Sequence, residues 1–154
     1  MLYLSALLIG IVAGLRAFTA PAAVAWAAWL GWLPVADSWA WFMGHWITPW
    51  IFSVLAVVEL VNDQRPSTPS RKAPTQFGAR LVMGALSGAT IGASAGMSIA
   101  GLVAGLVGAV IGTLGGYEAR KRLVAATGGR DLPIALVEDA VAVIGALLIV
   151  RSLS

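Results

Sequence analysis

The longest part of the chain without a charged side chain runs from residue 81 to residue 117, which is 37 residues. A helix that crosses a bilayer needs about 20 mostly apolar residues. This stretch is therefore too long for one untilted span and long enough for two short ones. Residues 2–36 contain a single charge, and residues 38–58 contain none. Such runs indicate an all-α membrane protein with several spans.

The composition excludes the soluble classes. Hydrophobic residues make up 59% of the chain and charged residues 11%, against roughly 45–50% and about 25% in soluble domains. Ten Lys/Arg and seven Asp/Glu are too few to form the charged surface of a soluble globular domain. The same low charge content excludes a disordered chain and a coiled coil. The absence of Cys excludes disulfides, thiol nucleophiles and Cys-ligated metals. We expect one membrane domain over residues 1–154 and no cofactor, and the sequence leaves metal binding open.

Two basic segments, residues 64–80 and 120–130, predict the topology. The positive-inside rule places both in the cytoplasm, so an even number of spans must separate them. We therefore expect residues 81–117 to form a hairpin that turns near Gly96. The five predicted spans are residues 2–31, 40–62, 79–95, 98–119 and 133–151, with a cytoplasmic N-terminus and an external C-terminus in a bacterial inner membrane. Four spans, with 81–117 as one long tilted helix, is the alternative.

All seven tryptophans lie between residues 26 and 50 and surround the expected outer turn at 31–38. Tryptophan favours the membrane–water interface, so the cluster is typical of an aromatic belt. A cage for a cation or a sugar is the alternative.

Glycines recur at helical spacing in the predicted hairpin. Such small-residue faces allow two helix backbones to approach closely. They predict a glycine-zipper hairpin within one chain, or else a homodimer seam or a pore lined by backbone. The rows consist of Gly84, Gly88, Gly92 and Gly96, followed by Gly101, Gly105, Gly108, Gly112 and Gly116.

Arg16 is the charge near the middle of the first expected span. A charge at mid-bilayer costs about 3 kcal/mol or more, so it is retained where it faces a polar interior or a partner. Pro21 lacks the N–H that would bond the carbonyl of Ala17, so we expect the helix to break near Pro21 and expose polar backbone. Broken helices line substrate sites in transporters. Arg16, Thr19 and Pro21 are thus candidate substrate-binding residues, and a structural ion pair of Arg16 is the alternative.

Glu59 and Asp63 are four residues apart, so they share one face at the cytoplasmic end of the second span. The proline-rich loop that follows carries Arg71. Its hydroxyl and basic groups suit a phosphate or an anionic headgroup. An ordinary helix end with a topology-setting loop is the alternative.

Glu138 and Asp139 follow a helix start at Asp131 and Pro133. Neighbouring residues on a helix point about 100° apart, so we expect at most one of the two acids to face a given cavity squarely. The topology places these acids on the cytoplasmic side. Glu59, Asp63, Glu118, Arg71, Arg80 and Arg120 are expected on the same side. Such a cluster fits a coupled proton or cation site or a structural salt-bridge network.

Four segments resemble a known family. They are residues 14–23, residues 59–71 with Pro66 and Pro69, residues 115–120, and the Glu138-Asp139 pair. They are similar to those of a bacterial membrane family catalogued as domain of unknown function 4126, and the resemblance covers essentially the whole chain. It implies a small multi-pass membrane protein and carries no established activity.

Three functions fit these patterns. The first is a transporter or channel for a small ion or metabolite, with Arg16 and the break near Pro21 as the site and Glu59 and Glu138 as coupling groups. The second is a structural or assembly subunit that binds a partner helix or a second copy of the chain through its glycine faces.

The third function is a membrane-embedded enzyme or binder that acts on an anionic lipid. Glu59 and Asp63 would hold a divalent ion, and Arg71 and Arg80 would hold a phosphate. This third function, which includes the enzyme, is less favoured than the transporter and the structural subunit. The expected partners are the lipid bilayer and a homodimer or partner helix. Nucleic acid is not expected, because the basic residues lie in short segments between apolar spans.

Overall fold

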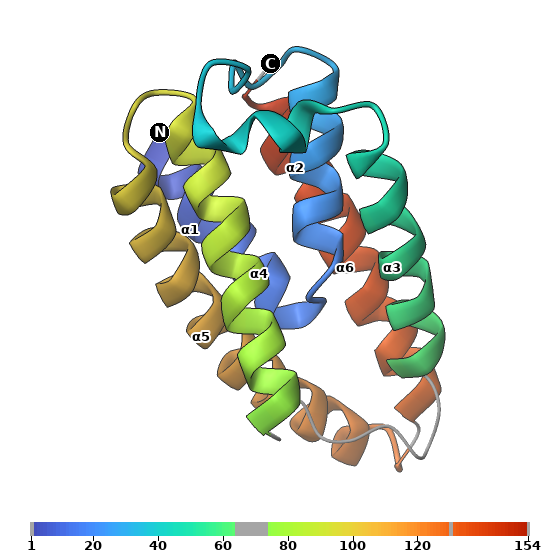
Figure 1. The fold of residues 1–154 in the computed structure, drawn as a ribbon. Coiled ribbons are helices and arrows are strands. Elements are labelled where there is room, and N and C mark those ends of the chain that lie inside the picture. The colour runs from blue at the N-terminus through green and yellow to red at the C-terminus, as the bar shows by residue number, and fades with distance from the viewer. Residues whose placement is uncertain (1, 64–73, 130, 154) are drawn as a thin grey trace.

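The structure is a computed structural model that describes residues 2–63, 74–129 and 131–153. These residues form an all-helical bundle of six α-helices and one 3-10 helix, shown in Figure 1. In chain order the elements are α1 (Leu2–Leu15), α2 (Thr19–Trp29), η1 (Trp39–Gly44), α3 (Thr48–Asp63), α4 (Pro74–Ala93), α5 (Ser98–Ala126) and α6 (Asp131–Arg151).

The first two helices form a reversal rather than one span. α1 runs away from the N-terminus into the bundle, and α2 runs back toward the end from which α1 came (Figure 1). Two contacts fix this path. The Tyr3 hydroxyl lies 3.0 Å from the Met97 sulfur, just before α5, and the guanidinium of Arg151 lies 5.5 Å from the ring of Trp32. Both chain termini therefore lie at one end of the bundle, which we call the terminal end.

The predicted span over residues 2–31 is thus wrong as a single crossing element. α1 has 14 residues and α2 has 11, which correspond to about 21 Å and 16 Å of helix at 1.5 Å per residue. The break lies at residues 16–18, slightly before Pro21. Pro21 occupies the first turn of α2, where a missing N–H leaves no helical hydrogen bond unmade.

The remaining helices alternate in direction along the bundle (Figure 1). α3 and α5 run away from the terminal end, and α4 and α6 run toward it. The opposite end, where α3 and α5 finish and α4 and α6 begin, is called the network end below. Because the α1–α2 pair reverses, the path differs from the expected one, in which the N-terminus and C-terminus lie on opposite sides.

Several predicted boundaries also differ. α3 begins at Thr48 and not near residue 40, because η1 and a short bend precede it, and α5 continues to Ala126 beyond the expected residue 119. Arg120 therefore lies in a helix and not in a loop, and Arg80 lies in α4, within the predicted span 79–95. Residues 81–117 form parts of two helices separated by a turn at residues 94–97, so the alternative of one long helix is wrong. Gly96 in that turn has a φ of +71°, a conformation that glycine adopts without strain.

Apolar length distinguishes some helices from others. Among the described residues, Ser98–Ala126 and Pro133–Arg151 are long and apolar enough to cross a membrane. Three shorter apolar helices accompany them, namely Leu2–Leu15, Thr48–Glu59 and Phe77–Ala93.

Glycines form the contact between α4 and α5. A side-chain carbon added at Gly88 would overlap the carbonyl oxygen of Gly101, and one added at Gly105 would overlap that of Gly84. A carbon at Gly92 would overlap the carbonyl of Met97 at the turn. The two backbones are therefore in direct contact, which only residues without a side chain permit.

The later glycines of α5 contact a different helix. A carbon added at Gly108 would overlap the carbonyl oxygen of Leu7, and one added at Gly112 would overlap that of Ile11. Gly10 of α1 lies against Gly105 in the same way. Gly116 is partly buried. The glycines of α5 were expected to form a single row. The glycines near the start of α5 contact α4, and the later ones contact α1.

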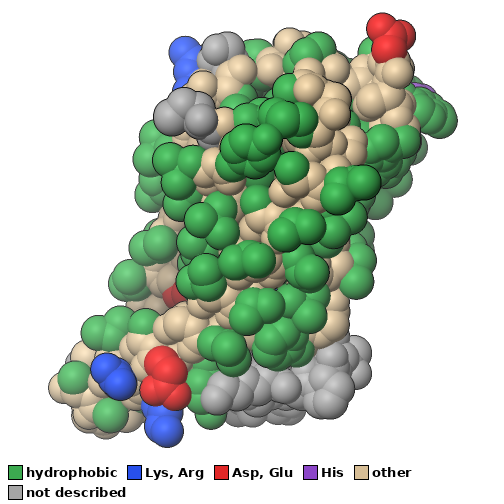
Figure 2. All heavy atoms as spheres, turned by 90° about the vertical axis from the view of Figure 1, so that its left-hand side faces the viewer, with side chains coloured by type: hydrophobic (Ala, Val, Ile, Leu, Met, Phe, Trp, Pro, Cys, Tyr) green, Lys and Arg blue, Asp and Glu red, His purple; other side chains and the backbone are tan. Residues whose placement is uncertain are grey.

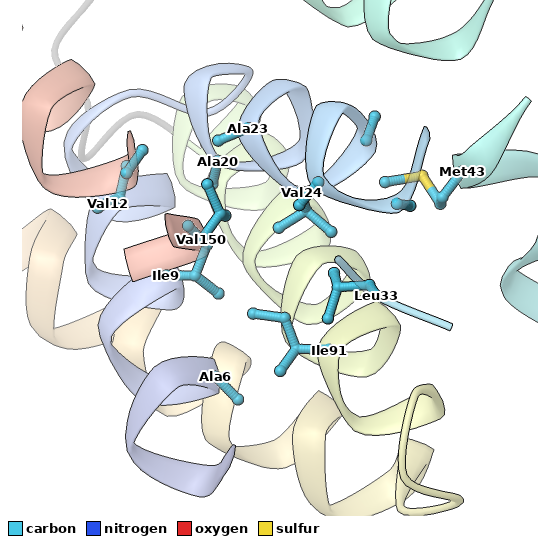
Figure 3. Packing of buried hydrophobic residues seen from close by; sticks show 14 of the residues in the cluster. Ala6, Ile9, Val12, Ala20, Ala23, Val24, Leu33, Met43, Ile91 and Val150 are labelled. Atoms are coloured by element: carbon cyan, nitrogen blue, oxygen red, sulfur yellow. The ribbon is translucent and has the colours of Figure 1, made fainter. Parts of the chain in front are cut away.

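Small apolar side chains fill the space between the α1–α2 pair and the other helices (Figure 3). Ile9 of α1, Val24 of α2 and Ile91 of α4 are fully buried, and Met43 of η1 closes this core at the terminal end. Alanines dominate the rest of the buried set. Small residues of this kind let helices pack closely around a reversed helix pair.

The outer surface is apolar between two polar ends. Figure 2 shows hydrophobic side chains over the middle of one face, with charged side chains gathered toward its top and bottom. On α5 the exposed apolar side chains include Ile99, Val103, Val107 and Ile111. An apolar surface with charges confined to its ends is the pattern that a bilayer requires.

The tryptophans lie at the terminal end, in α2, η1, the start of α3 and the segments between them. Trp29, Trp39, Trp41, Trp46 and Trp50 are all exposed. Trp26 is held inward, where its indole N–H donates to the Ser53 hydroxyl at 2.8 Å. These exposures suit the predicted aromatic belt, which stays a prediction.

Candidate charged site at the helix break

The carbonyl end of α1 is capped by cationic side chains. The guanidinium of Arg16 donates from Nη1 to the Leu15 carbonyl at 2.9 Å. Arg80 of α4 donates from Nε to the Gly14 carbonyl, also at 2.9 Å, and the Thr113 hydroxyl lies 3.4 Å from the same oxygen. The last carbonyls of a helix lack intrahelical partners and carry partial negative charge. Two arginines therefore satisfy the end of α1 and complement its dipole.

The amino end of α2 is capped by an acid. Both oxygens of the Glu59 carboxylate accept hydrogen bonds from backbone N–H groups, Oε2 from Ala17 at 2.7 Å and Oε1 from Phe18 at 2.9 Å. The first N–H groups of a helix carry partial positive charge. The Phe18 cap position has no side-chain hydrogen bond of its own, so Glu59, which comes from α3, supplies the cap.

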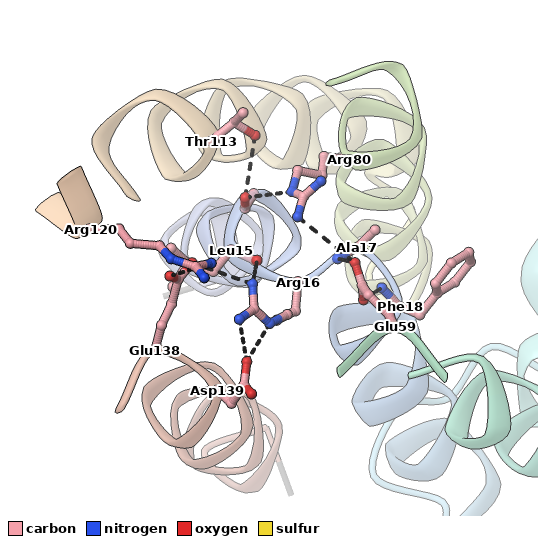
Figure 4. Close-up of polar contacts among 11 residues, drawn as sticks. Leu15, Arg16, Ala17, Phe18, Glu59, Arg80, Thr113, Arg120, Glu138 and Asp139 are labelled. Carbon is pink, nitrogen blue, oxygen red and sulfur yellow. Dashed lines mark hydrogen bonds and ion pairs between the residues drawn. The ribbon is translucent and has the colours of Figure 1, made fainter. Parts of the chain in front are cut away.

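Arg16 also contacts both acids of α6 (Figure 4). Its Nε donates to Asp139 Oδ1 at 2.5 Å, and its Nη2 forms an ion pair with the same oxygen. Its Nη1 lies 3.5 Å from Glu138 Oε1. Both adjacent acids therefore contact Arg16, and the expectation that at most one of them faces a given cavity squarely stays a prediction. One forked guanidinium reaches both carboxylates although they diverge around the helix.

Two further ion pairs complete the arrangement. Arg80 Nη2 lies 4.0 Å from Glu59 Oε2, and Arg120 Nη1 lies 3.7 Å from Glu138 Oε2. We use the name charged network for Arg16, Glu59, Arg80, Arg120, Glu138 and Asp139. Three arginines face three carboxylates, so the formal charges of the network balance.

Most of the charged network is removed from water, and its most exposed member among the ion pairs described is Arg120, at 19%. The Arg16 side chain is 0% exposed and that of Arg80 is 2% exposed, while the three carboxylate side chains are 10–11% exposed. Removing a charge from water carries a large desolvation penalty, which close opposite charges and hydrogen bonds offset. Every guanidinium in the network has such a contact with a carboxylate.

The predicted site residues therefore fall into four groups. Arg16, Glu59, Arg80, Glu138 and Asp139 come together. Thr19 and Pro21 are buried in the first turn of α2. Glu118 stands apart, because its half-exposed side chain pairs with Arg122 at 3.9 Å. Arg71 and the side chain of Asp63 lie outside the described residues.

Sequence reasoning missed Thr113 as a member of the site, and it grouped Arg120 with the other charges only by the side of the membrane on which they were expected. Arg120 was expected in a loop, but α5 continues through it. A signal was present, because Gly112, Gly116 and Arg120 are spaced four residues apart and share one helix face. That face of α5 points toward α1, so it carries Thr113 and Arg120 to the break.

A metal centre is not evident from the described side chains, which include no group of three or more His, Asp or Glu able to hold an ion. Glu59 uses both of its oxygens for backbone N–H groups. Arg80 points inward to Gly14 and Glu59. The lipid-phosphate arrangement expected for these two residues therefore receives no support from their contacts.

Comparison with known proteins gives one match. The family described as domain of unknown function (DUF4126) matches residues 3–152. The chain belongs to this family. The match covers the helix break and the whole charged network of this DUF4126 protein, in agreement with the resemblance seen in the sequence. Neither the curated proteins nor the solved structures contain a match to this DUF4126 chain.

Proposed function

We propose that this protein is a small membrane-embedded transporter or channel for a small ion or metabolite, with its site at the α1–α2 break. The observation that carries the proposal is the reversal of the chain between α1 and α2 inside an apolar bundle. Charged side chains cap the carbonyl end of α1 and the amino end of α2 at this break. Half-helix ends of this kind bind ions and charged substrates in transporters.

In this proposal α3, α4, α5 and α6 cross the bilayer, and α1 with α2 enters and leaves from one side. The two long apolar helices and the apolar outer surface support this arrangement. The basic segments around residues 64–80 and 120–130 support a cytoplasmic location for the network end. The tryptophan-rich terminal end then lies at the outer face of the bacterial inner membrane.

The charged network supplies the chemistry that such a site needs. Ionisable groups at membrane depth are expensive and are usually functional. Glu59 and Glu138 are the coupling groups in this proposal, because each faces an arginine and each side chain retains 10% exposure. Protonation of either carboxylate would remove one negative charge from a balanced set and change the hydrogen bonds at the break.

A structural or assembly role is the second candidate, and the burial of Arg16 favours it. Its guanidinium is sealed from water and contacts two acids and a carbonyl. In that role the network would only hold the reversed helices together. A glycine-zipper hairpin would set the α4–α5 spacing, and the bundle would bind a partner helix or a second copy.

A flux experiment separates the two candidates. The purified chain is reconstituted into liposomes, and fluxes of H⁺, Na⁺, K⁺, chloride and formate are measured with ion-sensitive dyes or electrodes. We expect flux of at least one ion. We expect Glu138→Gln, which keeps the shape of the side chain, to change that flux, while Arg122→Gln on the exposed surface leaves it unchanged.

Each variant is first checked for a single folded species by size-exclusion chromatography and circular dichroism. Folded wild-type protein that moves none of these ions above protein-free liposomes would overturn the transport proposal. Equal flux in wild type and in a folded Glu138→Gln variant would remove Glu138 from the coupling role.

A further inference from the structure

We infer, on the basis of the proposed function, that the break at the start of α2 is a binding site for a small monovalent anion. In this structure the carboxylate of Glu59 occupies it. That carboxylate belongs to α3 and reaches the site as a tethered anion, with one oxygen on the Ala17 N–H and the other on the Phe18 N–H. The substrate class is therefore a halide or a small monocarboxylate, which would take the place of Glu59.

The surroundings of these two N–H groups favour negative charge. They directly precede α2, a helix of 11 residues whose N-terminus carries partial positive charge. The Arg80 guanidinium lies 4.0 Å from the bound carboxylate and is itself buried. Anions bind at helix N-termini through this combination of N–H donors and dipole, and a buried guanidinium adds a charge-assisted partner.

Thr19 provides an independent indication of a ligand. Its side chain is 6% exposed, and its hydroxyl has no hydrogen-bond partner among the described residues. Thr19 directly follows Phe18 in the first turn of α2, and side chains on a helix tilt toward the N-terminus. A buried hydroxyl without a partner is unfavourable, and an anion on the adjacent N–H groups gives this hydroxyl an acceptor.

Charge balance explains why one anion binds at a time. With Glu59 in place, three carboxylates balance three arginines. When the Glu59 carboxylate leaves or becomes neutral, the charged network loses one of its three negative charges while its three arginines remain. A monovalent anion restores the balance, whereas a cation would add to the excess.

The test compares anion binding and anion flux in matched variants of the full chain. Binding of chloride and of formate is measured by calorimetry in lipid nanodiscs, with gluconate as the inert anion. We expect Glu59→Gln to bind one or both anions at least about tenfold more tightly than wild type, because the tethered competitor is gone. Thr19→Val should then weaken that binding about tenfold, as loss of one hydrogen bond to a charged group predicts.

Thr90→Val is the matched control, because Thr90 is a fully buried threonine of α4 whose hydroxyl bonds the Leu86 carbonyl. It should leave anion binding unchanged. Chloride binding and formate binding are reported separately, so that the result distinguishes a halide site from a carboxylate site.

Each outcome has a defined meaning. No tighter binding of either anion to folded Glu59→Gln protein would overturn the anion site, and if the liposomes still move a cation, the transport proposal survives. Anion binding that responds to Glu59→Gln and Thr19→Val, without flux of any ion, supports the site and overturns transport. Equal losses in Thr19→Val and Thr90→Val would show a general packing effect and would remove Thr19 from the site.

Discussion

At the residue scale, Arg16 joins the carbonyl end of α1 to α6. It bonds the last carbonyl of its own helix and pairs with Asp139 and Glu138 on α6. A guanidinium suits this position because its five donors lie in a fixed plane and its charge is permanent. A lysine would offer the same charge without the fork that reaches a carbonyl and two carboxylates together.

Substitution of Arg16 should destabilise the protein strongly. Arg16→Ala removes the guanidinium that pairs with the buried Asp139, and we expect a loss of about 3–5 kcal/mol in the free energy of unfolding. The double variant Arg16→Met with Asp139→Leu should recover most of that loss, because it removes both buried charges. Denaturant unfolding in detergent micelles, followed by circular dichroism, measures both values. A double variant as unstable as Arg16→Ala would contradict this prediction.

At the element scale, the glycines of α5 contact two neighbouring helices. Its first glycines contact α4, and its later ones contact α1. The partner changes because α1 runs beside this part of α5, with Gly108 against Leu7 and Gly112 against Ile11, until α1 ends at the break. The same helix face then brings Thr113 to the Gly14 carbonyl.

Glycine substitutions on α5 should have opposite effects at two positions. Gly105→Ala places a carbon against the Gly84 carbonyl oxygen and should cost roughly 1–3 kcal/mol by overpacking. Gly115→Ala meets nothing within 4 Å and should stabilise the helix by roughly 0.5–1 kcal/mol. Thermal unfolding of both variants in one detergent gives the comparison, and shifts of the same sign would disprove the α4–α5 contact.

At the scale of the whole molecule, the reversal of α1 and α2 determines where the termini lie. Among the described residues, α3, α4, α5 and α6 follow the reversed pair and alternate in direction, so the chain begins and ends at the terminal end (Figure 1). Contacts between Tyr3 and Met97 and between Trp32 and Arg151 hold that end together. The charged network lies toward the opposite end.

This path predicts the accessibility of added cysteines, which is simple to measure because the chain has none of its own. A cysteine tag on the N-terminus and Ser152→Cys near the C-terminus should react with a membrane-impermeant maleimide from the same side. Thr127→Cys, in the exposed segment after α5, should react from the opposite side. Labelling of the two termini from opposite sides of oriented vesicles would instead support the five-span path.

The sequence by itself determined the helical class, predicted a single apolar unit, and identified Arg16, Glu59 and the α6 acids as charges that need partners. Composition and long uncharged runs are sufficient for the first two, because a bilayer imposes length and polarity on each helix. The cost of a buried charge is sufficient for the third, because it requires a partner wherever the helix lies.

Only the tertiary structure decided that residues 2–31 reverse instead of crossing. A proline near Arg16 predicts a broken helix, but it does not specify the direction in which the chain continues. That direction depends on Glu59, Arg80 and Asp139, which cap the broken ends from three other helices. These residues are between 42 and 123 positions away in the chain, so no local pattern around the break reveals them. The reversal is stable because the carbonyl and N–H groups left without helical partners at the break form hydrogen bonds with those charged side chains. These hydrogen bonds exist only after the helices have packed.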